Sequence, residues 1–230
     1  MHTTSTTIAT LVSAGQIPTN TQILVLNGPT PISASPAGPT VETEPGTIWG
    51  SVETLPLIAT NGTWAQVLLP GLPNGSTGWV PLTAGTVQTD PWFLQVNMAT
   101  RQITAYNNGA AMMTSPAAIG APRTPTPMPA GGLSFLTGSL ATVGKYRVES
   151  PALRPLALQV TGAVAAVDDA AVGGTQVAIH GWEGEQTNAS VWGPTSGLPV
   201  SHACVRVPKA FAAGPLTVAP NGTLVGFIGA

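Results

Sequence analysis

Residues that break regular secondary structure are spread along this whole chain. Its 230 residues include 27 glycines and 23 prolines. Glycine weakens helices through its backbone entropy, and proline interrupts them because it has no amide hydrogen to donate. Hydrophobic residues still make up 43% of the chain, which is near the globular average, so we expect a buried core. The sequence therefore predicts a folded protein that is built from short strands and has few long helices.

Turn-forming pairs and apolar runs locate these strands. Asn-Gly occurs five times, and both residues tolerate the positive φ of tight type I′ hairpins; the pairs lie at 27–28, 61–62, 74–75, 108–109 and 221–222. Runs rich in Val, Ile, Leu, Thr and aromatic residues predict strands at 22–26, 64–69, 92–97, 103–106, 133–137, 156–160, 176–180 and 223–228. One short helix is expected at 208–213, with Pro208 at its first position. The predicted fold class is all-β.

The small number of charges excludes one class of partner. Seven Lys and Arg residues stand against nine Asp and Glu residues, which gives a net charge of −2. Seven cations cannot form the basic face that a nucleic acid requires. Apolar runs all fall short of the roughly 20 residues of a membrane-spanning helix, and residues 1–15 lack the basic and apolar regions of a signal peptide. We expect no nucleic-acid partner and no transmembrane segment, while a surface polar through Thr, Ser, Asn and Gln suits an exported protein.

The chain is expected to divide near residue 90. Before this point, Trp49, Trp64 and Trp79 stand among short apolar runs, where core packing is the favoured role for a tryptophan over a ligand groove. The Gly-Trp-Val strand that contains Trp79 resembles the one that often ends small bacterial SH3-like barrels. We therefore predict an SH3-like β domain with an N-terminal tail at 1–90 and a second domain at 91–230 that opens at Trp92.

The only cysteine, Cys204, lies close to two of the three histidines, His180 and His202. A lone cysteine excludes an intramolecular disulfide. Because a thiol needs a nearby base or cation to become a good nucleophile, the spacing of His202 and Cys204 is informative: on an extended strand, residues two apart point to the same face. Two other interpretations stay open from spacing alone. Cys204 could be a small buried hydrophobe beside a core histidine, or it could bind zinc with both histidines, the fourth ligand then being Asp168, Asp169 or Glu183.

A longer pattern around these residues resembles a known catalytic domain. The stretch Ser201-His202-Ala203-Cys204-Val205-Arg206, preceded by Ile179-His180-Gly181, resembles the signature of the L,D-transpeptidase (YkuD-type) family: His-Gly, a loop, then Ser/Thr-His-Gly-Cys-hydrophobic-Arg/Asn. Residues 92–106 with the following Asn-Asn-Gly resemble the opening strands of that domain, and 122–135, with Thr124-Pro-Thr-Pro, resemble its TPTG-x-F element. The resemblance spans about 92–230 and implies an L,D-transpeptidase β-sandwich.

The resemblance also implies a reaction and a set of partners. Members of this family cut the bond between the third and fourth residues of a peptidoglycan tetrapeptide stem, expel D-Ala and pass the acyl group to an amine of a neighbouring stem, which forms a 3→3 crosslink. The implied partners are peptidoglycan stem peptides, with carbapenems as inhibitors, and the implied location is extracytoplasmic. No cofactor and no metal are implied.

Roles for individual residues follow from the same resemblance. Cys204 would be the nucleophile and His202 the base, while Ser201 would help position the catalytic turn. The substrate-binding residues would be His180 and Gly181 in the donor site, Arg206 bracing the site or binding a stem carboxylate, and Ala203 together with the Cys204 backbone, whose N–H groups would stabilise the oxyanion. An ion pair of Arg206 with Glu183 or Glu185 is the structural alternative for that arginine.

Two departures from the family pattern matter. Ala203 replaces the usual glycine, so we expect it to adopt an ordinary negative φ with its methyl group turned away from the reacting carbonyl. The loop from Gly181 to Val200 is long and contains Trp182 and Trp192, which suits a substrate lid. An L,D-carboxypeptidase and a noncatalytic wall-binding module remain alternatives. A papain-like protease is disfavoured because Cys204 lies near the C-terminus.

Overall fold

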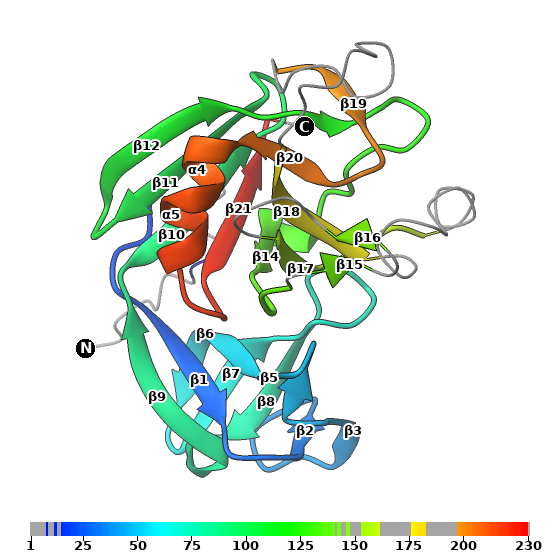
Figure 1. Cartoon of the computed structure of the whole chain (residues 1–230). Helices are drawn as coiled ribbons and strands as arrows, with labels where there is room; N and C mark the ends of the chain where they lie inside the picture. The colour runs from blue at the N-terminus through cyan, green and yellow to red at the C-terminus, as the bar shows by residue number, and fades with distance from the viewer. Residues whose placement is uncertain are drawn as a thin grey trace.

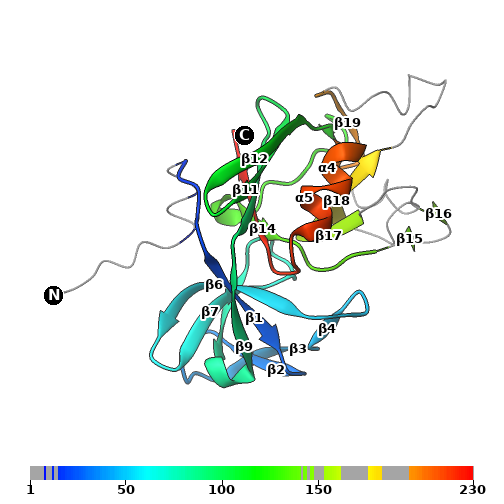
Figure 2. The same cartoon turned by 60° about the vertical axis from the view of Figure 1, so that its left-hand side comes forward.

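The structure is a computed structural model of the chain. It describes residues 8, 12, 15–140, 142–143, 146–147, 153–161, 176–182 and 197–229. Figures 1 and 2 show two lobes, one carrying the strands before Pro91 and the other carrying the later strands and both labelled helices. The all-β prediction is confirmed, because strands make up most of the described chain.

One lobe is formed by a seven-stranded antiparallel sheet from residues 21–90. Its strands are β1 (Thr21–Leu26), β2 (Thr30–Ser33), β3 (Thr40–Glu44), β6 (Thr54–Asn61), β7 (Trp64–Leu68), β8 (Thr77–Pro81) and β9 (Gly85–Asp90), in the order β3-β2-β8-β7-β6-β1-β9. A separate hairpin pairs β4 (Thr47–Ile48) with β5 (Ser51–Val52), and a 3-10 turn, η1 (Leu82–Ala84), precedes β9. The SH3-like identity of this lobe stays a prediction.

The other lobe has two larger sheets with a short helical pair. The five-stranded sheet has the order β12 (Ala110–Pro116), β11 (Gln102–Asn107), β10 (Trp92–Asn97), β21 (Leu224–Ile228) and β14 (Leu133–Phe135). The three-stranded sheet has the order β17 (Leu153–Gln159), β18 (Gln176–Trp182) and β20 (Val205–Pro208). The remaining elements are β13 (Ile119–Gly120), β15 (Thr142–Val143), β16 (Tyr146–Arg147), β19 (Pro199–Ser201), η2 (Ala130–Gly132), α4 (Lys209–Ala213) and α5 (Pro215–Val218).

These two sheets enclose the main hydrophobic core. Alternate side chains of β10, β11 and β21 meet those of β17, β18 and β20, while α4 and α5 contribute Phe211 and Leu216. Along β18, for example, Val177 and Ile179 are buried in this core. Because side chains alternate across a strand, the intervening residues of β18 point to the other face of the sheet. That outer face carries the candidate site.

A second core joins the lobes. Leu24 and Leu55 of the seven-stranded sheet pack in one buried cluster with Phe93, Phe135 and Leu224 of the later strands. Hydrogen bonds cross the same junction, since the Asn74 side chain both donates to and accepts from the Gln159 backbone at 2.8 Å. Burying aromatic and aliphatic side chains from both lobes favours their association.

Most of the predicted elements form, with two differences. Asn108–Gly109 has positive φ at both residues and joins paired strands β11 and β12, as predicted. The pairs at 61–62 and 74–75 also lie between paired strands. The Asn-Gly pairs at 27–28 and 221–222 do not close hairpins, because β1 pairs with β6 and β9 and β21 pairs with β10 and β14 instead of their chain neighbours. The helix begins at Lys209, one residue later than expected, and no helix of the described residues is long and apolar enough to cross a membrane.

Two carboxyl groups face each other at the base of the β4–β5 hairpin. The side chain of Glu53 is only 1% exposed and accepts a hydrogen bond from the Gly46 amide at 3.0 Å. Burial, a hydrogen bond with Glu53 and the charges of Glu53 and Glu42 raise the pKa of Glu44 to about 8. Burial also raises the pKa of Glu53. Glu44 is therefore still largely protonated at neutral pH.

This pair predicts a pH dependence of stability. A carboxyl whose folded-state pKa is raised stabilises the fold fully below its unfolded pKa, near 4.5, and this contribution is lost as the pH rises toward about 8. Glu44→Gln removes the titration but keeps hydrogen-bonding atoms. We expect it to raise the free energy of unfolding at pH 8 by about 1 kcal/mol relative to wild type, less than the full pKa shift would give because solvent screens the partly exposed Glu44 carboxyl, with a smaller effect at pH 5. Urea denaturation at both values measures this, and equal effects at both would contradict it.

Candidate active site

Cys204 lies just before β20, on the outer face of the three-stranded sheet that also carries His180 and Arg206. Strands β18 and β20 are parallel, and their register places His180 opposite Arg206. Two residues back along both strands, Cys204 packs with Ala178 of β18 and with Leu153 of β17 in a small apolar cluster. Because Ala178 and His180 are two residues apart on one strand, they share a face. The register therefore sets Cys204 two residues from the His180–Arg206 pair on this face, and the roles of these three residues in the site stay predictions.

The residues before Cys204 form a bend. Strand β19 ends at Ser201, β20 begins at Val205, and His202 and Ala203 form a bend between them. The expected geometric reason for bringing His202 near the thiol, two residues on one strand face, is therefore wrong. His202 is exposed, whereas Cys204 is 6% exposed. A short separation of the His202 ring and the Cys204 sulfur stays a prediction.

Ala203 adopts the left-handed conformation that glycine usually occupies. Its φ is +70°, so the expectation of an ordinary negative φ is wrong. An L-residue in this region is less stable by about 1–2 kcal/mol. The methyl group is completely buried in the main core, away from the outer face, so any contact of Ala203 with a ligand on that face has to come from its backbone. The bend keeps the backbone shape that the family's glycine would give.

Buried hydroxyl groups hold this bend in place. The Ser201 hydroxyl donates to the Cys204 carbonyl across the bend. From a loop nearly eighty residues earlier, the Thr124 hydroxyl donates to the Ser201 carbonyl at 3.0 Å, and the Thr126 hydroxyl donates to the Ala203 carbonyl at 2.7 Å. Thr126 in turn accepts from the Gly120 amide at 2.9 Å. Ser201 is therefore placed to support the turn rather than to face solvent.

Sequence reasoning missed the contribution of Thr124 and Thr126. The residues were noted only as part of a Thr-Pro-Thr-Pro stretch that resembles a family element. Both hydroxyls are buried, and a buried hydroxyl needs a partner. The signal in the sequence is two threonines that each precede a proline, but nothing local indicates that their partners lie at Ser201 and Ala203.

His180 is held as a neutral imidazole. Burial lowers the pKa of His180 to about 4; the hydrogen bond with the Gly181 carbonyl opposes this shift, and the positive charge of Arg206 adds to it. The Nδ1 atom lies 3.0 Å from the Gly181 carbonyl oxygen. Since a carbonyl oxygen only accepts, Nδ1 carries the proton and Nε2 keeps a lone pair. His180 can thus accept one hydrogen bond from a ligand but does not supply a charge near neutral pH.

Arg206 and Gly181 complete this part of the site. The Arg206 side chain is buried, and its backbone exchanges two hydrogen bonds with Ala118, at 2.8 and 2.9 Å. Gly181 is buried in β18, where it pairs with Val207. The alternative ion pairs of Arg206 with Glu183 or Glu185 lie outside the described residues.

The zinc hypothesis and the lid hypothesis fall largely on residues that the structure does not describe. Asp168, Asp169 and Glu183 are among these, as is Trp192 of the long loop. Within the described residues, no group of three or more His, Cys, Asp and Glu side chains could hold a metal ion. Neither hypothesis is carried further.

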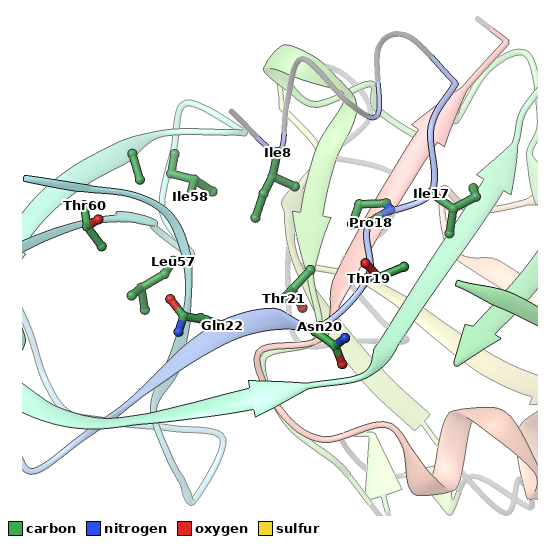
Figure 3. Close-up of a pocket in the computed structure, with 11 residues that line it drawn as sticks. Ile8, Ile17, Pro18, Thr19, Asn20, Thr21, Gln22, Leu57, Ile58 and Thr60 are labelled. Atoms are coloured by element: carbon green, nitrogen blue, oxygen red, sulfur yellow. The ribbon is translucent and has the colours of Figure 1, made fainter. Parts of the chain in front are cut away.

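A separate pocket lies outside the candidate active site. It has a volume of about 390 Å³ and is lined by residues 17–22 and by Leu57, Ile58, Ala59 and Thr60 of β6, together with Ile8 (Figure 3). Threonine and aliphatic side chains dominate its walls, and none of the predicted site residues contributes to it.

Comparison with known proteins decides the family. The family model described as the L,D-transpeptidase catalytic domain (YkuD) matches residues 91–225. The chain belongs to the YkuD L,D-transpeptidase family. A search of curated proteins finds no match.

Several solved L,D-transpeptidases match this chain at low sequence identity. One from Mycobacterium smegmatis is 12% identical, and the match covers 86% of this chain and 100% of that chain with a TM-score of 0.44. One from Mycobacterium tuberculosis H37Rv is 12% identical, with 76% and 90% covered and a TM-score of 0.46. The Enterococcus faecium C442S mutant is 15% identical, with 89% and 76% covered and a TM-score of 0.41. Because these TM-scores are low, the family assignment rests on the match to residues 91–225.

The matched region contains every residue discussed above as part of the site. The cluster of Cys204 with Leu153 and Ala178, the bend at residues 202–203 and the hydroxyl groups of Thr124 and Thr126 all lie within this L,D-transpeptidase domain. The resemblance noted from the sequence is therefore confirmed at the level of the family.

Proposed function

We propose that the protein is a peptidoglycan L,D-transpeptidase that forms 3→3 crosslinks through an acyl-enzyme on Cys204. The observation that carries the proposal is the position of Cys204 in a domain of this family: its side chain packs against Ala178, two residues before His180 on β18. Peptidoglycan lies outside the cytoplasmic membrane, so the protein would act in an extracytoplasmic compartment. Its partners would be stem peptides, and carbapenems would acylate the same thiol.

The first half of the reaction forms the thioester. The Cys204 sulfur attacks the carbonyl carbon of the third stem residue while its proton passes to His202. Backbone N–H groups of the bend stabilise the oxyanion, each donor contributing about 3–4 kcal/mol. The bond to D-Ala then breaks, and D-Ala leaves with the proton from His202.

The second half transfers the acyl group. An amine of a neighbouring stem attacks the thioester carbon and His202 takes the proton from that amine. The carbon–sulfur bond then breaks, and His202 returns the proton to the Cys204 sulfur, which restores the thiol. The neutral His180 ring offers its Nε2 lone pair to an N–H group of the donor. Arg206, two residues from Cys204 and opposite His180, supplies a positive charge for a stem carboxylate.

The same thioester would also support carboxypeptidase activity if water replaced the amine. Incubation with a disaccharide-tetrapeptide, followed by mass spectrometry, separates the two. We expect loss of D-Ala together with crosslinked dimer, and a carbapenem-treated sample is the control. D-Ala loss without dimer would favour the carboxypeptidase, and no reaction of any kind would contradict the proposal.

A further inference from the structure

The bend before Cys204 combines an unfavourable backbone conformation at Ala203 with a buried hydrogen bond from the Thr126 hydroxyl, which we call the brace. Ala203 holds a φ of +70°, and its carbonyl oxygen accepts the Thr126 hydroxyl at 2.7 Å. We propose that Thr126 is a positioning residue, whose hydroxyl holds Ala203 in the left-handed conformation and thereby aligns Cys204 for acyl transfer. This inference rests on the proposed role of Cys204 as nucleophile.

The bond from Thr126 controls the orientation of a whole peptide unit. The Ala203 carbonyl and the Cys204 amide belong to one planar group, and in a trans peptide they point in opposite directions. Holding the carbonyl toward Thr126 therefore fixes the direction of the Cys204 N–H. This N–H is one of the groups that the proposed mechanism assigns to the oxyanion, so its direction bears on the rate of acylation.

Thr126 is itself fixed from the opposite side. The Gly120 amide donates to its hydroxyl oxygen at 2.9 Å, which leaves the hydroxyl hydrogen directed at Ala203. The loop closes tightly at this point, because a Cβ atom at Gly120 would overlap the Thr124 carbonyl oxygen and the Thr126 nitrogen. A brace built on such a constrained loop restricts the bend more than a hydroxyl on a mobile surface loop would.

The identity of residue 203 makes the brace necessary. Alanine disfavours positive φ, whereas glycine populates positive and negative φ about equally. Without the brace, an alanine bend would spend much of its time in other conformations, and the rate would fall by the fraction of competent molecules. A glycine bend would lose far less. The effect of removing the Thr126 hydroxyl should therefore depend on the side chain at position 203.

A double-mutant cycle tests this dependence. The variants are Thr126→Val, Ala203→Gly and the pair, and the readout is the rate of Cys204 acylation by imipenem, followed by intact-protein mass spectrometry. We expect Thr126→Val to slow acylation about tenfold or more when alanine is kept at position 203, and less than about threefold in the Ala203→Gly background. Ala203→Gly alone should change the rate less than about tenfold. Thr126→Ser keeps the hydroxyl and should retain most of the rate.

Thr21→Val is the matched control. Thr21 is also buried and donates its hydroxyl to a distant backbone carbonyl, that of Asp90, but it lies in the seven-stranded sheet. The Thr21→Val variant should leave the acylation rate unchanged, both with alanine and with glycine at position 203. Equal slowing by Thr126→Val in both backgrounds would overturn the proposal. If that variant folds only with glycine at position 203, the coupling is supported; if it folds in neither background, the coupling is contradicted.

A second readout does not depend on activity. Hydrogen–deuterium exchange of the peptide that contains residues 201–204 should be faster in Thr126→Val than in wild type, and this difference should shrink in the Ala203→Gly background. If wild type is not acylated at all, the proposed function fails, and the exchange data still decide the role of Thr126. Unchanged exchange in Thr126→Val would overturn it.

Discussion

Cys204→Ala is expected to abolish crosslinking and D-Ala release, with a loss of at least about 10³-fold. Cys204 is the only thiol of the chain, so no other residue can form the proposed thioester. The fold should survive, because Cys204 packs in a small cluster with Leu153 and Ala178, and loss of one sulfur there should cost about 1 kcal/mol. The measurement is product formation by mass spectrometry, together with the melting temperature of the variant.

Cys204→Ser is the companion variant. It keeps the size and polarity of the side chain but replaces the thiol by a much weaker nucleophile. A loss similar to that of the alanine variant would show that thiol chemistry, and not packing, is required. Turnover above a few per cent of wild type in Cys204→Ala would contradict the assignment of the nucleophile.

Arg154→Met is expected to give the largest loss of stability. The Arg154 side chain is 3% exposed, and its guanidinium donates to three backbone carbonyls and one side-chain oxygen, those of Gly138, Leu216, Ala219 and Asn221. Burial lowers the pKa of Arg154 to about 10, and the charge of Asp90 opposes this shift. Arg154 is therefore still a cation at neutral pH and joins β17 to the segment after β14 and to the end of α5.

Removing this cation leaves several buried acceptors without a donor. It also leaves Asp90, whose own pKa burial raises, without a neighbouring positive charge. We expect a loss of about 3–5 kcal/mol in the free energy of unfolding, measured by urea denaturation at pH 7. The exposed Arg123 provides the matched control, since Arg123→Met should change stability by less than about 0.5 kcal/mol. A loss below about 1 kcal/mol for Arg154→Met would contradict the role of this residue.

Local patterns were enough to predict most strands. The apolar runs at 92–97 and 176–180 correspond to β10 and β18, whereas the position of His180 in the same pocket as Cys204 and His202 stays a prediction. The Asn-Gly pairs were less informative where pairing is long-range: β1 pairs with β6 and β9, so the pair at 27–28 joins strands that are not neighbours.

The bend shows why the backbone conformation of Ala203 could not be predicted from the local sequence. A substitution of alanine for the family's glycine suggested a different φ, because an isolated alanine avoids the left-handed region. In the folded chain, the buried methyl group and the Thr126 hydroxyl act on the same residue. These interactions come from segments far apart in the sequence, and they hold a conformation that local propensity disfavours.

The central claim is that Cys204 forms a covalent acyl-enzyme with a stem peptide. The most direct measurement is intact-protein mass spectrometry of the wild-type protein mixed with a tetrapeptide donor in the absence of acceptor, followed by proteolysis and mapping of the adduct. The account predicts a mass increase equal to the donor minus D-Ala, located on the peptide that contains Cys204 and missing from Cys204→Ala. An adduct on another residue, or D-Ala release that persists in Cys204→Ala, would contradict it.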